Sequence, residues 1–136
     1  MRIFLDANIL FSAAKSRGAV RELLERMLDA GHECCADGFV AEEARRNLAA
    51  KAPQGVPVLV TLLARMHVAD VHPSPATFQT APPLPEKDRP VLAGAIRQRC
   101  DVLLTGDRTH FGALYGKAVQ GVTIHSPRSL AEILFR

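Results

Sequence analysis

Two short apolar runs that each end in an aspartate constrain the fold of this chain. Ile3–Leu5 stops at Asp6, and Val102–Leu104 is joined to Asp107 by a Thr-Gly turn. Short apolar runs bounded by polar residues are typical of buried strands in a parallel sheet. Because an unpaired buried charge is costly, we expect each aspartate just past the carboxyl end of its strand, where open α/β sheets bind ligands.

Amphipathic patterns lie between the apolar runs. The expected strands are residues 3–5, 33–36, 67–71, 102–104 and 122–124. The expected helices begin near residues 8, 20, 39, 57, 86 and 127. Strands that alternate with helices in this way indicate an α/β fold in which helices cover both faces of a parallel sheet.

The predicted helices carry recognisable end signals. Asn8 is expected to cap the first helix, and either Asp37 or Gly38 the helix that follows the second strand. Gly31 is expected to end the second helix. Residues 72–85 hold five of the nine prolines and are predicted to form an extended surface connection.

Composition narrows the class of protein. A chain of 136 residues can bury its own core as one domain, residues 1–136. No stretch is long and apolar enough to span a membrane and no signal peptide is visible, so we expect a cytoplasmic protein without a membrane partner. The three cysteines form no CxxC pair and are expected to be free buried thiols.

The charge balance suits a polyanionic partner. Seventeen Lys and Arg face fourteen Asp and Glu. If four acids converge in one site, the remaining surface carries an excess of about seven positive charges, which favours contact with nucleic acid. Solvated basic faces are the alternative interpretation, because the sequence contains no dense block of basic residues.

Four acids mark the ends of predicted elements: Asp6, Glu43, Asp88 and Asp107. In a parallel sheet the strand-end acids open on one edge, where helices that follow strands also begin. Asp88 joins them only if its helix starts near that edge. Glu42 and Glu43 point about 100° apart on a helix, so only one can face the site, and Glu43 is preferred because it borders the apolar stripe.

Clustered carboxylates raise one another's pKa unless a cation balances them. Oxygen ligands of this kind, with no accompanying His or Cys set, favour Mg²⁺ or Mn²⁺ over Zn²⁺. Such ions support in-line displacement at phosphate. Taken singly, each acid also has a structural interpretation: Asp88 as a helix cap, Asp107 as a turn residue and Asp101 as a turn or ion-pair residue. The set of four favours a site, and Asp101 is assigned to structure.

The ordered motifs resemble those of a known family. They are Leu5-Asp-Ala-Asn8, Glu43 followed by Leu48, Asp88–Ile96, and Asp101–Asp107 followed by Phe111. Together they are similar to PIN-domain nucleases, notably the VapC-like toxins of bacterial type II toxin–antitoxin pairs.

The resemblance implies a five-stranded parallel sheet between helices and metal-dependent endonucleolytic cleavage of RNA. It assigns Asp6, Glu43, Asp88 and Asp107 as catalytic acids that bind Mg²⁺ or Mn²⁺. The accessory polar positions matched by Asn8 and Thr105 are candidates for substrate contact. The resemblance also implies a homodimer and an antitoxin protein as partner.

Basic residues near the acids are candidates for phosphate contact, and solvated charge is the alternative for each. They are Arg45, Arg46, Arg89 and Arg108, of which Arg108 is the preferred substrate contact. His110 is expected to be a solvated neighbour of Asp107, with a phosphate contact as the alternative. The loops at residues 52–56 and 72–85 are expected to select the RNA.

Other functions fit parts of the pattern. A non-toxin PIN nuclease of RNA processing would share the four acids, whereas a catalytically idle scaffold that binds RNA or protein would not need them. A phosphatase with Asp6 as nucleophile usually carries a second aspartate two residues later, where this chain has Asn8. A dinucleotide-binding domain is disfavoured because no GxGxxG motif follows the first strand.

Overall fold

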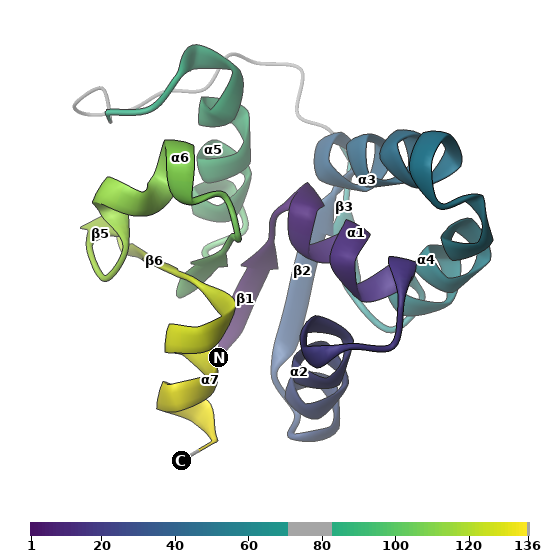
Figure 1. Cartoon of the computed structure of the whole chain (residues 1–136). Coiled ribbons are helices and arrows are strands. Elements are labelled where there is room, and N and C mark those ends of the chain that lie inside the picture. Colours follow the sequence, from purple (N-terminus) through teal and green to yellow (C-terminus); the bar gives the residue numbers. More distant parts are fainter. Residues whose placement is uncertain (71–82, 136) are drawn as a thin grey trace.

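The computed structural model describes residues 1–70 and 83–135, and a six-stranded sheet runs through the middle of the molecule with helices on either side (Figure 1). The strand order is β3-β2-β1-β4-β6-β5. The strands are β1 (Arg2–Leu5), β2 (Glu33–Asp37), β3 (His67–Ala69), β4 (Val102–Leu104), β5 (Ala118–Val119) and β6 (Val122–His125). The predicted α/β fold is therefore confirmed.

The five predicted strands are parallel, and β5 adds an unexpected sixth strand antiparallel to β6. Gln120 and Gly121 join β5 to β6 with φ angles of 48° and 88°. Two residues at positive φ are typical of a two-residue hairpin turn. The sequence pattern did not reveal β5 because two residues are too few to show the alternation of apolar and polar residues that is typical of a strand.

The described residues contain seven α-helices. They are α1 (Ala7–Lys15), α2 (Ala19–Asp29), α3 (Gly38–Lys51), α4 (Val56–Leu63), α5 (Arg89–Arg97), α6 (Arg108–Phe111) and α7 (Pro127–Leu134). Short 3-10 turns precede α4 and α5 and follow α6, at Pro53–Gly55, Glu86–Asp88 and Gly112–Leu114. Most of the predicted extended connection at 72–85 lies outside the described residues.

Strand order brings the two aspartate-bearing strand ends together. From β1 the chain proceeds to β2 and β3 on one side and then returns to β4 on the other side of β1. The boundary between β1 and β4 is therefore the point where the strand order reverses. Ligands of open α/β sheets bind at such a point, beyond the carboxyl ends of the strands.

Helix caps follow the predictions with one correction. Asp37 caps α3 by accepting a hydrogen bond from Val40 N at 3.1 Å. Gly31 follows α2 with a φ of 88°, as expected of a residue that ends a helix. The prediction that Asn8 caps the first helix is wrong, because Asp6 occupies the cap position and Asn8 lies inside α1.

The core is built on the two central strands. Phe4 and Leu5 of β1 and Leu103 and Leu104 of β4 have no exposed surface. The predicted free thiols are confirmed, since all three cysteines are unpaired and buried. Among the described helices, none is both long and apolar enough to cross a bilayer.

A close approach of α5 to the sheet makes Gly94 sensitive to substitution. A Cβ atom at Gly94 would lie 2.5 Å from Asp37 Oδ2 and 3.1 Å from Phe4 Cζ. We expect Gly94→Ala to lower the free energy of unfolding by about 1–3 kcal/mol, because overpacking outweighs the helix propensity of alanine. Urea denaturation measures the effect. Gly112→Ala is the control, since a Cβ there would meet nothing within 4 Å, and an equal effect in both variants would contradict the packing explanation.

Candidate metal centre and substrate pocket

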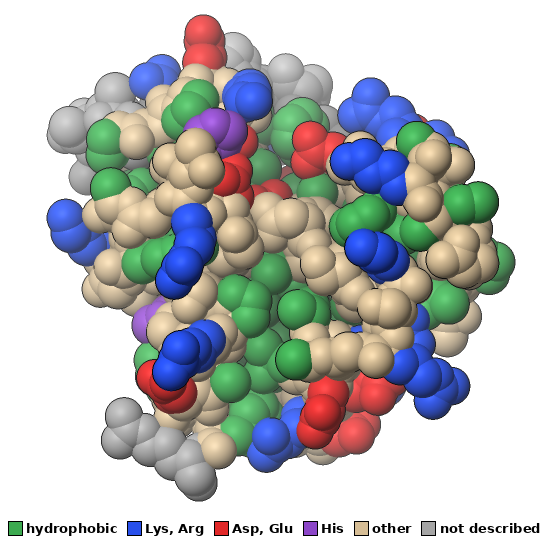
Figure 2. Space-filling model, in the orientation of Figure 1, with side chains coloured by type: hydrophobic (Ala, Val, Ile, Leu, Met, Phe, Trp, Pro, Cys, Tyr) green, Lys and Arg blue, Asp and Glu red, His purple; other side chains and the backbone are tan. Residues whose placement is uncertain are grey.

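A pocket of about 420 Å³ lies where β1 and β4 end. All four acids predicted from the sequence line it, namely Asp6, Glu43, Asp88 and Asp107. They come from the end of β1, from α3, from the amino end of α5 and from the loop after β4. His110 lines the same pocket from α6. In Figure 2 the Asp and Glu side chains and a His gather in a hollow of the surface.

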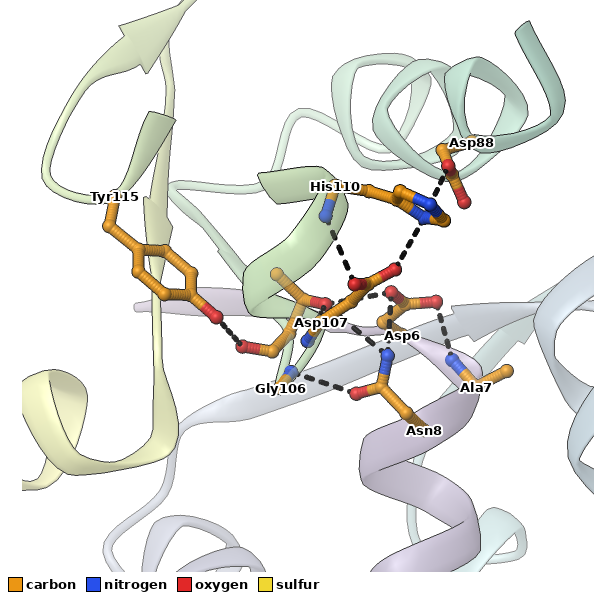
Figure 3. Close-up of polar contacts among 9 residues, drawn as sticks. Asp6, Ala7, Asn8, Asp88, Gly106, Asp107, His110 and Tyr115 are labelled. Atoms are coloured by element: carbon orange, nitrogen blue, oxygen red, sulfur yellow. Dashed lines mark hydrogen bonds and ion pairs between the residues drawn. The ribbon is translucent and has the colours of Figure 1, made fainter. Parts of the chain in front are cut away.

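Asp6 is the most deeply buried of these acids, with 5% of its surface exposed. Its Oδ1 accepts a hydrogen bond from Ala7 N at 2.7 Å, and its Oδ2 accepts from Thr105 Oγ1 at 2.8 Å and Asn8 Nδ2 at 3.1 Å (Figure 3). Burial raises the pKa of Asp6 to about 6, although the bonds from Thr105 and Ala7 oppose that rise and the charge of Glu43 adds to it. A cation beside this carboxylate would favour its charged form.

Asn8 and Thr105 tie the two strand-end loops together. Asn8 Oδ1 accepts a hydrogen bond from Gly106 N at 2.8 Å, while its Nδ2 reaches Thr105 Oγ1 at 3.4 Å. Thr105 is fully buried, and its carbonyl accepts a hydrogen bond from the Tyr115 hydroxyl at 3.0 Å. Both side chains therefore position Asp6 in this structure. Asn8 also lines the pocket, whereas Thr105 does not, and contact of either with substrate stays a prediction.

His110 lies between two of the acids. Its Nδ1 is 2.9 Å from Asp88 Oδ2 and 2.8 Å from Asp107 Oδ2 (Figure 3). Its backbone N–H donates to Asp107 Oδ1 at 3.1 Å, so Asp107 also caps α6. The expectation of a solvated neighbour is therefore wrong. Its position three residues after Asp107, on the same helical turn, was the sequence signal that it could share the site.

The donor set around His110 fits a divalent cation. Single ligand atoms of Asp88, Asp107 and His110 lie within 4.8 Å of one another. Asp88 Oδ2 and His110 Nδ1 are shielded from solvent and lack a hydrogen bond of good geometry, despite their short separation. Asp88 also makes no cap bond to α5. Carboxylate oxygens suit Mg²⁺ and Mn²⁺, and the imidazole nitrogen suits a transition metal better than Mg²⁺.

Glu43, not Glu42, faces the pocket. Glu43 is half-buried in the pocket wall, and its charge contributes to the raised pKa of Asp6. Glu42 is exposed and accepts a hydrogen bond from Arg45 Nε at 2.9 Å. The geometry therefore supports the choice of Glu43 and leaves Arg45 paired on the surface.

The remaining polar predictions fall outside this pocket. Asp101 Oδ2 accepts a hydrogen bond from Arg2 N at 2.8 Å, as expected of a structural residue. Arg108 lines a separate pocket of about 360 Å³ with Gly106, Tyr115 and Ser126. A role of Arg108 in substrate binding stays a prediction.

The comparisons with known proteins bear on the fold. No family model matches the sequence, and no curated protein matches it. Among solved structures, a chain of VapBC2 from Rickettsia felis, bound to a DNA fragment from their promoter, superposes with a TM-score of 0.68 at 16% identity. The match covers 93% of this chain and 98% of that chain. This chain therefore has the fold of a chain of the VapBC2 complex, in agreement with the fold that the motifs predicted.

Proposed function

We propose that this chain is a cytoplasmic endoribonuclease that depends on Mg²⁺ or Mn²⁺ and acts as the toxin of a toxin–antitoxin pair. Residues 1–136 form its single nuclease domain. The observation that carries the proposal is the convergence of Asp6, Glu43, Asp88 and Asp107 with His110 in one pocket at the point where the strand order reverses.

The residues of the pocket would have different roles. Asp88, Asp107 and His110 would hold the ion, with Asp6 and Glu43 as the remaining acids of the pocket. When bound, the ion supplies Lewis acidity at the phosphate and activates a water for in-line attack. Asn8 and Thr105 fix the Asp6 carboxylate through hydrogen bonds, and burial keeps bulk water away from it.

Two observations support RNA and an antitoxin protein as partners. The net charge of +3 includes the acids of the pocket, so the rest of the surface is more basic than the sum suggests. The similar structure of VapBC2 from Rickettsia felis is a complex on promoter DNA, which favours a partner protein for this chain as well. A homodimer is part of the same proposal.

The test is cleavage of a labelled single-stranded RNA by the purified protein in Mn²⁺, Mg²⁺ or EDTA. We expect cleavage only with a metal, and Asp88→Asn to reduce it by about a hundredfold or more because a charged ligand of the ion is lost. Glu42→Gln is the matched control, since Glu42 is exposed and pairs with Arg45.

Two results would contradict the proposal. Equal cleavage by wild type and Asp88→Asn would point to a contaminating nuclease. A folded wild-type protein that neither cleaves several RNAs nor binds Mn²⁺ would favour the catalytically idle scaffold.

A further inference from the structure

The acidic pocket continues into an end that is aromatic and basic. Phe11 of α1 and Asn47 and Lys51 of α3 line the same pocket as Asp6. The Nζ atoms of Lys15 and Lys51 lie 5.7 Å and 6.0 Å from the centre of the Phe11 ring. In Figure 2, hydrophobic side chains lie between Lys or Arg side chains beside the acidic hollow. The pocket therefore combines its acids with an aromatic ring and a cation on α1 and α3, and Lys87 beside Asp88 lines it as well.

The geometry of α3 determines the order in which these side chains follow one another along the pocket. Glu43, Asn47 and Lys51 follow one another at intervals of four residues on α3, so they lie on one face about 6 Å apart along the axis. The α1 helix packs against α3 and carries Phe11 and Lys15 one turn apart. The two helices thus present an acid, an amide, an aromatic ring and two cations in sequence from the carboxylate cluster outward.

We propose that this end of the pocket binds an unpaired nucleotide of the RNA next to the cleaved phosphate, with its base stacked on Phe11. Lys15 and Lys51 contact the neighbouring phosphates, and Asn47 is placed to hydrogen-bond the base edge. The inference rests on the proposed function and deepens it, since it names the residues that would hold a nucleotide beside the acids. Bases inside a duplex are already stacked and cannot offer a face to an aromatic side chain.

The Phe11 ring is held in place by the core, whereas the ammonium groups of Lys15 and Lys51 beside it are loosely held. Phe11 is half-buried and packs against the core, so its position is fixed on one side. Both lysines are exposed, and neither forms an ion pair within the described part of the chain. Their distances from the ring are near the limit of a cation–π contact, so a phosphate can compete for them.

A second aromatic–cation pair provides an internal comparison. Arg26 Cζ lies 4.1 Å from the centre of the Phe135 ring, well inside the range of a cation–π contact. This pair joins α2 to the residue after α7 and does not line the acidic pocket. Phe135 is therefore a matched control for Phe11.

Stacking can be observed directly with Phe11→Trp. Because the chain contains no Trp, the new indole is the only one, and its fluorescence reports on its own surroundings. We expect titration with a single-stranded RNA oligomer to quench the emission in Ca²⁺, used in place of Mn²⁺, and the same sequence in a duplex to leave it unchanged. Constant emission while the anisotropy of labelled single-stranded RNA reports binding would overturn the inference, as would equal quenching by the duplex.

Affinity measurements separate this subsite from the metal centre. We expect Phe11→Leu to raise the Kd for the labelled oligomer and the KM for cleavage about tenfold, with kcat nearly unchanged and with recovery in Phe11→Tyr. Lys51→Ala should lower the slope of log Kd against log salt concentration by about the amount expected for one phosphate contact. Phe135→Leu and Lys117→Ala are the controls, because Lys117 is exposed and does not line the acidic pocket.

The outcomes distinguish the two proposals. Wild-type affinity in both Phe11→Leu and Lys51→Ala, in a wild type that cleaves RNA, would overturn the subsite and leave the nuclease intact. A wild type that binds RNA without cleaving it would overturn the proposed nuclease activity. The Kd values of Phe11→Leu and Lys51→Ala would then still show whether the subsite exists. A wild type that binds no RNA would overturn both.

Discussion

Asp6→Asn is expected to reduce metal-dependent RNA cleavage by about a thousandfold. The substitution removes the charge of a carboxylate that is 5% exposed and whose two oxygens are already oriented by three hydrogen bonds. Loss of that charge weakens the pocket for a cation and removes several kcal/mol of transition-state stabilisation. Initial rates in saturating Mn²⁺, with the melting temperature of each protein, measure the effect.

Asp101→Asn is the matched control for this variant. Asp101 is an aspartate that precedes β4, but it bonds the backbone of Arg2 and does not line the acidic pocket. Its amide replacement keeps an oxygen acceptor for that bond, so cleavage should stay within about twofold of wild type. Equal losses of activity in the two variants would show that the effect of Asp6→Asn is not specific to the pocket.

Asp6 is also expected to make the metal-free protein less stable as the pH rises. Its pKa of about 6 in the folded chain exceeds the value of 3.8 expected for an unperturbed aspartate. The stabilising contribution is complete below pH 3.8 and is lost as the pH rises through 6, because the unfolded chain releases the proton first. In EDTA, this carboxyl is expected to lower the free energy of unfolding by about 2 kcal/mol between pH 4 and pH 7.

The measurement is urea denaturation of wild type and Asp6→Asn at several pH values in EDTA. Burial also raises the pKa of Asp37, so other groups contribute to the slope and only the difference between the two proteins isolates Asp6. At pH 7, Mn²⁺ at a hundredfold excess over its Kd should raise the free energy of unfolding of wild type by about 3 kcal/mol. The gain should be much smaller in the variant. Parallel pH profiles for both proteins in EDTA would contradict this assignment.

Local sequence patterns revealed the elements and their ends. The apolar run before Asp6 and the run before Asp107 are β1 and β4, and Asp37, one of the two predicted caps, caps α3. These features depend on residues within a few positions of one another, so the spacing of apolar residues and the types of capping residue predict them. The choice of Glu43 over Glu42 followed from the same local geometry, because adjacent residues on a helix face different directions.

The sequence by itself therefore determined which residues end the strands and begin the helices, and which acids were available for a site. Only the tertiary structure decided which of them meet. Asp88 reaches Asp107 because the chain returns to β4 beside β1, and that strand order depends on packing between distant segments. His110 between two carboxylates, Asn8 between two loops, and Phe11 beside Lys51 all depend on the same long-range packing, which no local pattern records.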